Sequence, residues 1–74
     1  MATLHSAPST QAVKWNVFID EWAPGSLAFA QELETASESI KSLGGGVYEV
    51  VISEKDLLPI TNEHGVALLK LEEM

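Results

Sequence analysis

The stretch that most constrains the fold is residues 26–46, SLAFAQELETASESIKSLGGG. Apolar side chains recur along it at spacings of four, three, four and three, namely Phe29, Leu33, Ala36, Ile40 and Leu43. At 100° per residue these positions share one side of a helix, and polar side chains take the other side. The run therefore predicts the only long helix of the chain, amphipathic and facing a core with one side.

The residues before and after this run support a helix with defined ends. Pro24-Gly25 suits the centre of a type II turn, because proline fixes φ and glycine accepts a positive φ. Ser26 would then cap the first free N–H groups of the helix. After the apolar stripe, Gly44 is the residue type that ends helices in the left-handed conformation, and two further glycines discourage continuation.

Two segments have the alternation of β-strands. Residues 13–20, VKWNVFID, alternate apolar and polar side chains, with Phe18 as the one apolar residue on the polar side. Trp15, on the apolar side, is expected in the core. Residues 47–53, VYEVVIS, alternate in the same way and are rich in β-branched side chains, which favours a second strand.

The C-terminal third is less regular. Residues 54–61 predict a loop or a single helical turn capped by Ser53 and limited by Pro59. Asn62–Gly65 is typical of a four-residue hairpin turn with its glycine in the left-handed region. Residues 66–72, VALLKLE, have the composition of a helix, but this turn and the need for a strand to pair with 47–53 favour a third strand.

These elements predict an α+β fold in the order β-α-β-β, with one amphipathic helix packed on a small three-stranded sheet. The second and third strands are expected to be antiparallel neighbours. A chain of 74 residues forms one core, which we assign to residues 13–74. Residues 1–12 have no charged side chain and are expected to be a flexible N-terminal leader, or else a tail that folds on a partner.

The charge balance excludes several classes of function. Four lysines and no arginine face eleven aspartates and glutamates, for a net charge of −7. We therefore expect no binding to nucleic-acid phosphates or to an anionic membrane surface, because both require basic residues. It contains no apolar run of about 18 residues, which a spanning helix would need. The absence of cysteine removes disulfides and thiolate metal ligands, and a cytoplasmic location is expected.

No group of residues in the sequence specifies a reaction. Asp20 and Glu21 are adjacent, so in a strand they would point to opposite faces, unlike the paired carboxyls of an acid–base couple. Glu63 and His64 provide one carboxylate and one imidazole, too few ligands for a metal site, and the other histidine is His5. We therefore expect no catalytic residue, metal, cofactor or small-molecule substrate.

A single helix covers only one face of the predicted sheet. The other face would carry an apolar set comprising Phe18, Val47, Val51, Val66 and Leu68. Contiguous apolar surface of this kind marks interaction sites on soluble proteins. Three coverings are open: residues 54–61 folding over the face with their leucines and isoleucine, a second copy of the chain, or another protein.

Trp22 and the carboxylates add to this interpretation. Trp22 lies outside the strand pattern, and either caps the end of the core or serves as an exposed aromatic anchor, the residue type enriched at binding hot spots. The carboxylates either confer solubility or steer the chain towards a basic groove. The residues expected to bind a partner are Phe18, Asp20, Glu21, Trp22, Val51 and Leu68.

The sequence thus predicts a non-catalytic acidic protein-interaction module. The specific version is a small regulator or inhibitor that occupies a basic groove on nucleic-acid-processing machinery, such as an RNA polymerase or a nuclease. This is an analogy in size and charge with small phage-encoded regulators, and no residue motif supports it. The alternative is a structural subunit or homodimeric assembly domain that uses its exposed apolar sheet face.

Overall fold

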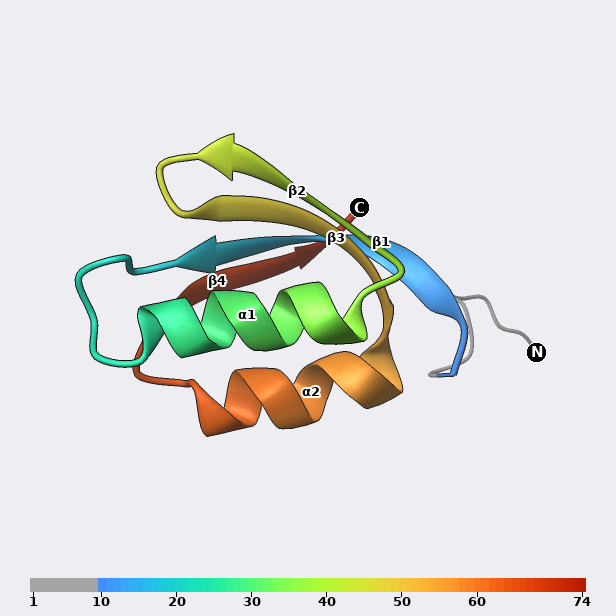
Figure 1. Cartoon of the computed structure of the whole chain (residues 1–74). Coiled ribbons are helices and arrows are strands. Elements are labelled where there is room, and N and C mark those ends of the chain that lie inside the picture. The colour runs from blue at the N-terminus through green and yellow to red at the C-terminus, as the bar shows by residue number, and fades with distance from the viewer. Residues whose placement is uncertain (1–9) are drawn as a thin grey trace.

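The computed structural model describes residues 10–74 as a four-stranded sheet with two helices (Figure 1). The elements are β1 (Ala12–Ile19), α1 (Ser26–Ala36), β2 (Ser39–Gly44), β3 (Val47–Ser53), α2 (Glu54–Glu63) and β4 (Leu68–Glu73). The expected leader over residues 1–12 lies outside the described part, apart from its last three positions. Of these, Ala12 already belongs to β1.

The strands are all antiparallel to their neighbours, in the order β2-β3-β1-β4. The two strands that α1 connects have β3 between them, and the two strands that α2 connects have β1 between them. This β-α-β-β-α-β arrangement is the ferredoxin-like, or split β-α-β, motif. The α+β class is confirmed, whereas the predicted count of one helix and three strands is too small by one of each.

The first two predicted strands are present. β3 has the predicted bounds, and β1 begins and ends one residue earlier than expected. They are direct antiparallel neighbours, with Trp15 opposite Val50 and Val17 opposite Tyr48. This register places the apolar side chains of both strands on the same face of the sheet, because alternate residues of a strand point the same way.

The long helix is the main error of the sequence-based prediction. α1 ends at Ala36, and Ser37 is already extended, with φ −84° and ψ 148°. The next residues form β2, in which Ile40 lies opposite Val50 and packs against the core from a strand. Residues 39–43 fit a strand as well as a helix, since Ile40 and Ser42 alternate with Lys41. Pairing with the edge of β3 decides between the two periodicities.

The glycine run forms a hairpin turn and not the end of a helix. Gly44 pairs with Val47, which leaves Gly45 and Gly46 as a two-residue loop between β2 and β3. Their φ angles are +62° and +86°, and a type I′ turn requires positive φ at both central positions. The turn holds the two strands in register.

The segment predicted as a loop or single turn is the ten-residue helix α2. Ser53 caps it as predicted, since its Oγ accepts a hydrogen bond from the Asp56 N–H at 3.2 Å. Pro59 lies inside the helix, where it lacks the N–H that would bond to the carbonyl of Lys55. Burial of Leu57 against the sheet keeps the helix in place despite this loss.

The predicted hairpin before the last strand is wrong. Gly65 does not have a positive φ, and α2 continues through Asn62 and Glu63. Residues 64–67 then connect α2 to β4, which is a strand as predicted. However, β4 pairs with β1 and not with β3, because β2 already occupies the outer edge of β3.

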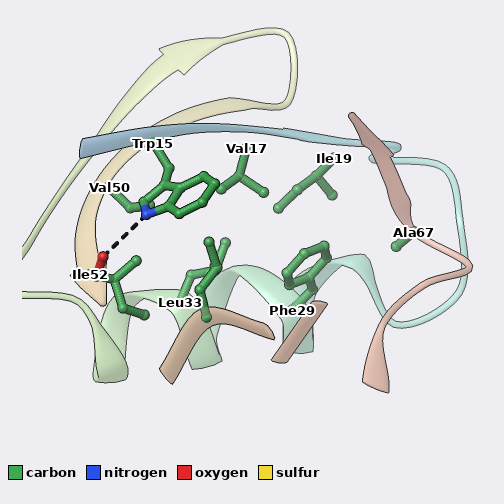
Figure 2. Packing of buried hydrophobic residues seen from close by; sticks show 9 residues of the cluster. Trp15, Val17, Ile19, Phe29, Leu33, Val50, Ile52 and Ala67 are labelled. Carbon is green, nitrogen blue, oxygen red and sulfur yellow. Dashed lines mark hydrogen bonds between the residues drawn. The ribbon is translucent and has the colours of Figure 1, made fainter. Parts of the chain in front are cut away.

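The core lies between the two helices and one face of the sheet, which we call the inner face (Figures 1 and 2). Its buried side chains come from all the layers: Trp15, Val17, Ile19, Phe29, Leu33, Val50, Ile52, Leu57 and Ala67. Trp15 is in the core as predicted, and its Nε1–H donates a hydrogen bond to the Ile52 carbonyl at 3.2 Å. The indole nitrogen is therefore satisfied without solvent.

Within the described residues, no helix combines the length and the apolar character that crossing a membrane would require.

Replacing Gly46 by alanine should destabilise the fold strongly. A Cβ at Gly46 would collide with the backbone carbonyl of Ile19, and φ is +86°. A left-handed conformation costs a residue with a Cβ about 1–2 kcal/mol, and overpacking adds about 1–3 kcal/mol. Urea unfolding followed by circular dichroism should therefore show a loss of about 3 kcal/mol for Gly46→Ala.

Gly45→Ala is the matched control, because Gly45 also has a positive φ but a Cβ there would have no neighbour within 4 Å. It should lose only the conformational part, about 1 kcal/mol. Equal losses for the two variants would contradict the close approach of the hairpin to β1.

Candidate functional site

Three of the five connections between elements lie at one end of the molecule, which we call the loop end: residues 20–27, 43–46 and 63–69. β1 and α2 finish there, α1 and β4 begin there, and the β2–β3 hairpin turns there (Figure 1). Two backbone hydrogen bonds of 2.8 Å join these segments. The Ile19 N–H donates to the Gly46 carbonyl, and the Asp20 N–H donates to the Ala67 carbonyl.

Exposed apolar side chains are concentrated at the loop end. The described residues include seven exposed large hydrophobic side chains, and five belong to it: Trp22, Leu27, Leu43, Val66 and Leu69. Trp22 is 95% exposed and Val66 is 80% exposed. Single exposed apolar residues are ordinary, but their gathering at one end is a feature of interaction surfaces.

The exposure of Trp22 excludes one of its two predicted roles. A side chain that is 95% exposed does not cap the core, so only the role of an exposed aromatic remains. Its backbone N–H donates a hydrogen bond to Asp20 Oδ1 at 3.0 Å. Asp20 therefore shapes the loop that presents the indole, an arrangement that aspartate makes commonly in turns.

The predicted type II turn is present at residues 23–26, immediately after Trp22. The Ser26 N–H donates to the Ala23 carbonyl at 3.3 Å, and Gly25 has φ 82° and ψ 3°, the values of the third residue of that turn. Ser26 does not cap α1 as expected. Its Oγ instead donates to the Glu21 carbonyl at 3.1 Å and ties the helix start to the loop.

Five of the six predicted partner-binding residues lie at or beside the loop end. Asp20, Glu21 and Trp22 belong to its first segment, and Phe18 immediately precedes that segment on β1. Val51 lies further along β3, opposite Lys14, and does not join them. Leu68 starts β4 at this end, but its side chain does not point where the sequence suggested.

The orientation of Leu68 corrects the sequence-based prediction. Leu68 lies opposite Ile19 and packs against the core, so it belongs to the inner face and not to the opposite one. A register shift between Phe18 and Ile19 inserts one extra residue in β4. That residue is Leu69, which is 67% exposed.

The sheet face opposite the helices, which we call the outer face, carries three of the apolar side chains predicted for it: Phe18, Val47 and Val51. Val66, which was also predicted for it, lies in the connection before β4. Of the three coverings left open, folding of residues 54–61 over this face is excluded, because α2 packs on the inner face. Within residues 10–74, nothing covers the outer face.

Charged side chains interrupt the apolar surface of the outer face. Lys14 pairs with Glu49 at 3.5 Å, and Lys70 pairs with Glu72 at 3.0 Å. The Lys70 ammonium also lies 5.5 Å from the centroid of the Phe18 ring, in a cation–π arrangement. The outer face is therefore mixed, and its apolar surface is smaller than the sequence suggested.

A groove of about 390 Å³ runs between α1 and the edge of the sheet. Leu27, Ala30 and Glu34 line it from α1, and Ile40, Ser42 and Tyr48 line it from β2 and β3. An adjoining hollow of about 200 Å³ shares three of these residues and adds Glu21, so the groove opens onto the loop end. This groove was not predicted, because Ile40 was assigned to the helix.

A second feature missed by sequence reasoning joins α1 to the end of α2. Glu32, Glu63 and His64 place their potential metal-ligand atoms within 4.8 Å of one another. His64 Nε2 lies 3.0 Å from Glu32 Oε2, and the imidazole stacks on Phe29 with ring centroids 5.2 Å apart. These ligand types suit zinc. Two of these three residues, Glu32 and His64, already contact each other, so we interpret the cluster as a contact between α1 and the end of α2.

Comparisons of the chain with protein-family models, with curated proteins and with solved structures find no match. The motif described above is shared by proteins of unrelated function.

The two tryptophans should respond oppositely to truncation. Trp22→Ala removes an exposed side chain and should change the free energy of unfolding by no more than about 0.5 kcal/mol. Trp15→Ala empties part of the core, leaves the Ile52 carbonyl without its donor and should cost about 3–5 kcal/mol. Urea unfolding followed by far-ultraviolet circular dichroism measures both. A loss above about 1 kcal/mol for Trp22→Ala would show that the indole supports the fold.

Proposed function

We propose that this chain is a non-catalytic protein-interaction module that binds a larger protein through its loop end, in the cytoplasm. The observation that carries the proposal is the concentration of exposed apolar side chains there, five of the seven among the described residues. Trp22 is the central element, because tryptophan is enriched at hot spots and this one is held in a defined loop.

The charge of this surface indicates the kind of partner. The three segments of the loop end contain the carboxylates Asp20, Glu21 and Glu63 and no lysine. With a net charge of −7 for the chain, a basic surface would attract it and orient it during encounter. The specific form of the proposal is therefore a regulator or inhibitor that occupies a basic groove of nucleic-acid-processing machinery, such as an RNA polymerase or a nuclease.

The size of the apolar contribution shows how much of the loop end must take part. Full burial of one such side chain contributes roughly 1.5–3 kcal/mol. Association costs about 4–15 kcal/mol in lost translational and rotational freedom. Trp22 alone does not offset that cost, so several of the five side chains must be buried together against the partner.

A second candidate is self-assembly through the outer face. It is supported by the half-buried Phe18, Val47 and Val51, which no other part of residues 10–74 covers. A homodimer of this kind would be held by apolar contacts and would depend little on salt, whereas binding steered by the carboxylates would weaken as ionic strength rises.

Affinity capture with matched variants tests the proposal. The tagged chain and its Trp22→Ala/Val66→Ala variant would be used as baits at low and at high ionic strength, with recovered proteins quantified by mass spectrometry. Loss of these two side chains should reduce recovery of a specific protein by about tenfold or more, since hot-spot truncations cost about 2 kcal/mol. High salt should reduce recovery by the unaltered bait.

Leu58→Ala is the control, because Leu58 is an exposed leucine on α2, away from the loop end. It should recover the same protein in the same amount as the unaltered bait. Equal recovery by the unaltered and the doubly altered bait would refute binding through the loop end. Sedimentation of the purified chain over a range of concentrations would reveal the homodimer instead.

A further inference from the structure

We propose that the groove between α1 and β2 binds an extended peptide, which adds as a fifth strand to the free edge of β2. Alternate side chains of the peptide would enter the groove, and they would combine an apolar residue with lysine or arginine. The inference rests on the proposed function and specifies the form of the partner segment that is bound.

β2 forms a free edge of the sheet. Among the described residues, β2 pairs only with β3, so the N–H and C=O groups on its other side are open to a further strand. The pairs from Ser39 to Ser42 are regular, and the register shifts only between Ser42 and Gly44. Four consecutive residues therefore present an uninterrupted edge.

The two edges of the sheet are not equally protected. Both edge strands have one register shift, but β4, the opposite edge, carries three charged residues, Lys70, Glu72 and Glu73. Charges on an edge strand discourage pairing with another chain. β2 carries a single charge, Lys41, which lies opposite Glu49 of β3 and therefore on the outer face. The less protected edge is thus the edge that borders the groove.

The shape and chemistry of the groove suit an apolar side chain. Ile40 and Tyr48 are half-buried and form its sheet side, and Leu27 forms an exposed apolar wall. α1 leaves these residues uncovered because it packs over the centre of the sheet, where Phe29 and Leu33 are buried. Every second side chain of a strand added beside β2 would point to the inner side and thus into this groove. Its volume of about 390 Å³ lies within the range of about 300–1,000 Å³ found for ligand sites.

The charge of the groove favours a basic peptide. Glu34 lies on the helix wall of the groove, and Glu21 lies where the groove opens onto the loop end. Neither the groove nor the adjoining hollow is lined by a lysine. A peptide with an apolar residue facing Leu27 and Ala30, and basic residues two positions before or after it, would satisfy both the apolar walls and the carboxylates.

Selection from a displayed library of random octapeptides tests the inference without knowledge of the natural partner. The enriched peptides should alternate, with an apolar residue and lysine or arginine on the same side. Nuclear magnetic resonance of the labelled chain should then show amide shifts in residues 39–43 and at Leu27 and Tyr48. Absence of enrichment, or shifts confined to other residues, would overturn the inference.

Two controls make the test specific. Glu34→Lys should weaken the best peptide about tenfold or more, whereas Glu54→Lys, the same charge change at the exposed start of α2, should have little effect. N-methylation of alternate peptide amides should abolish binding in one of the two possible patterns, because only one set of amides faces β2. Binding that survives both patterns would exclude strand addition.

The outcomes for the groove and for the loop end can be separated. Peptide binding that persists in Trp22→Ala/Val66→Ala, with no protein captured through the loop end, would overturn the proposed function and leave the groove as a peptide site. Capture that depends on Trp22 and Val66 but not on Glu34 would support the proposed function and overturn the strand addition.

Discussion

The structure depends on the antiparallel pairing of β1 with β3, which places Trp15 opposite Val50 and directs their side chains to the inner face. Almost all the apolar surface that residues 10–74 bury is gathered there, under the two helices. A small domain has few apolar side chains to spare, and this one uses them on a single face. The outer face therefore carries both apolar and charged side chains, and the connections carry exposed apolar side chains.

The same topology produces the loop end. Each of the two helices connects strands that run in the same direction, and the hairpin connects antiparallel strands. Three of the connections must therefore fall at the end where β1 finishes. Residues that are distant in sequence, such as Trp22 and Val66, are brought to one end by this connectivity. The hydrogen bonds from Ile19 and Asp20 to the other two segments hold the three together.

The sequence predicted those parts of the fold in which one periodicity dominates. β3 and the first half of the long helix were predicted correctly, because Val50 and Ile52 alternate without conflict and Phe29 and Leu33 lie one turn apart. Prediction failed where two periodicities coincide: Ile40 fits a helical stripe and a strand equally, and only its pairing with Val50 decides. A Gly-Gly pair between two alternating segments is a hairpin signal that could have revealed the error.

Pro59 caused the second failure, since a proline argues against a helix interior and only the burial of Leu57 overrides it. The candidate site was predictable residue by residue but not as a surface. Trp22 was identified as unusual because it departs from the strand pattern. By contrast, the groove depends on β2, and the Glu32–His64 contact joins positions 32 residues apart, so neither leaves a local trace.

The way Trp22 is held bears on whether its exposure is incidental. An indole on a flexible loop would lose conformational freedom on binding, which weakens affinity. Here the Asp20 carboxylate, the type II turn at Gly25 and the Ser26 hydroxyl each fix part of the loop. Ala23 of this segment packs against the core, whereas Trp22 is 95% exposed. The proposed binding through the loop end would benefit from this order, because the indole is presented in one conformation beside the groove and the edge of β2.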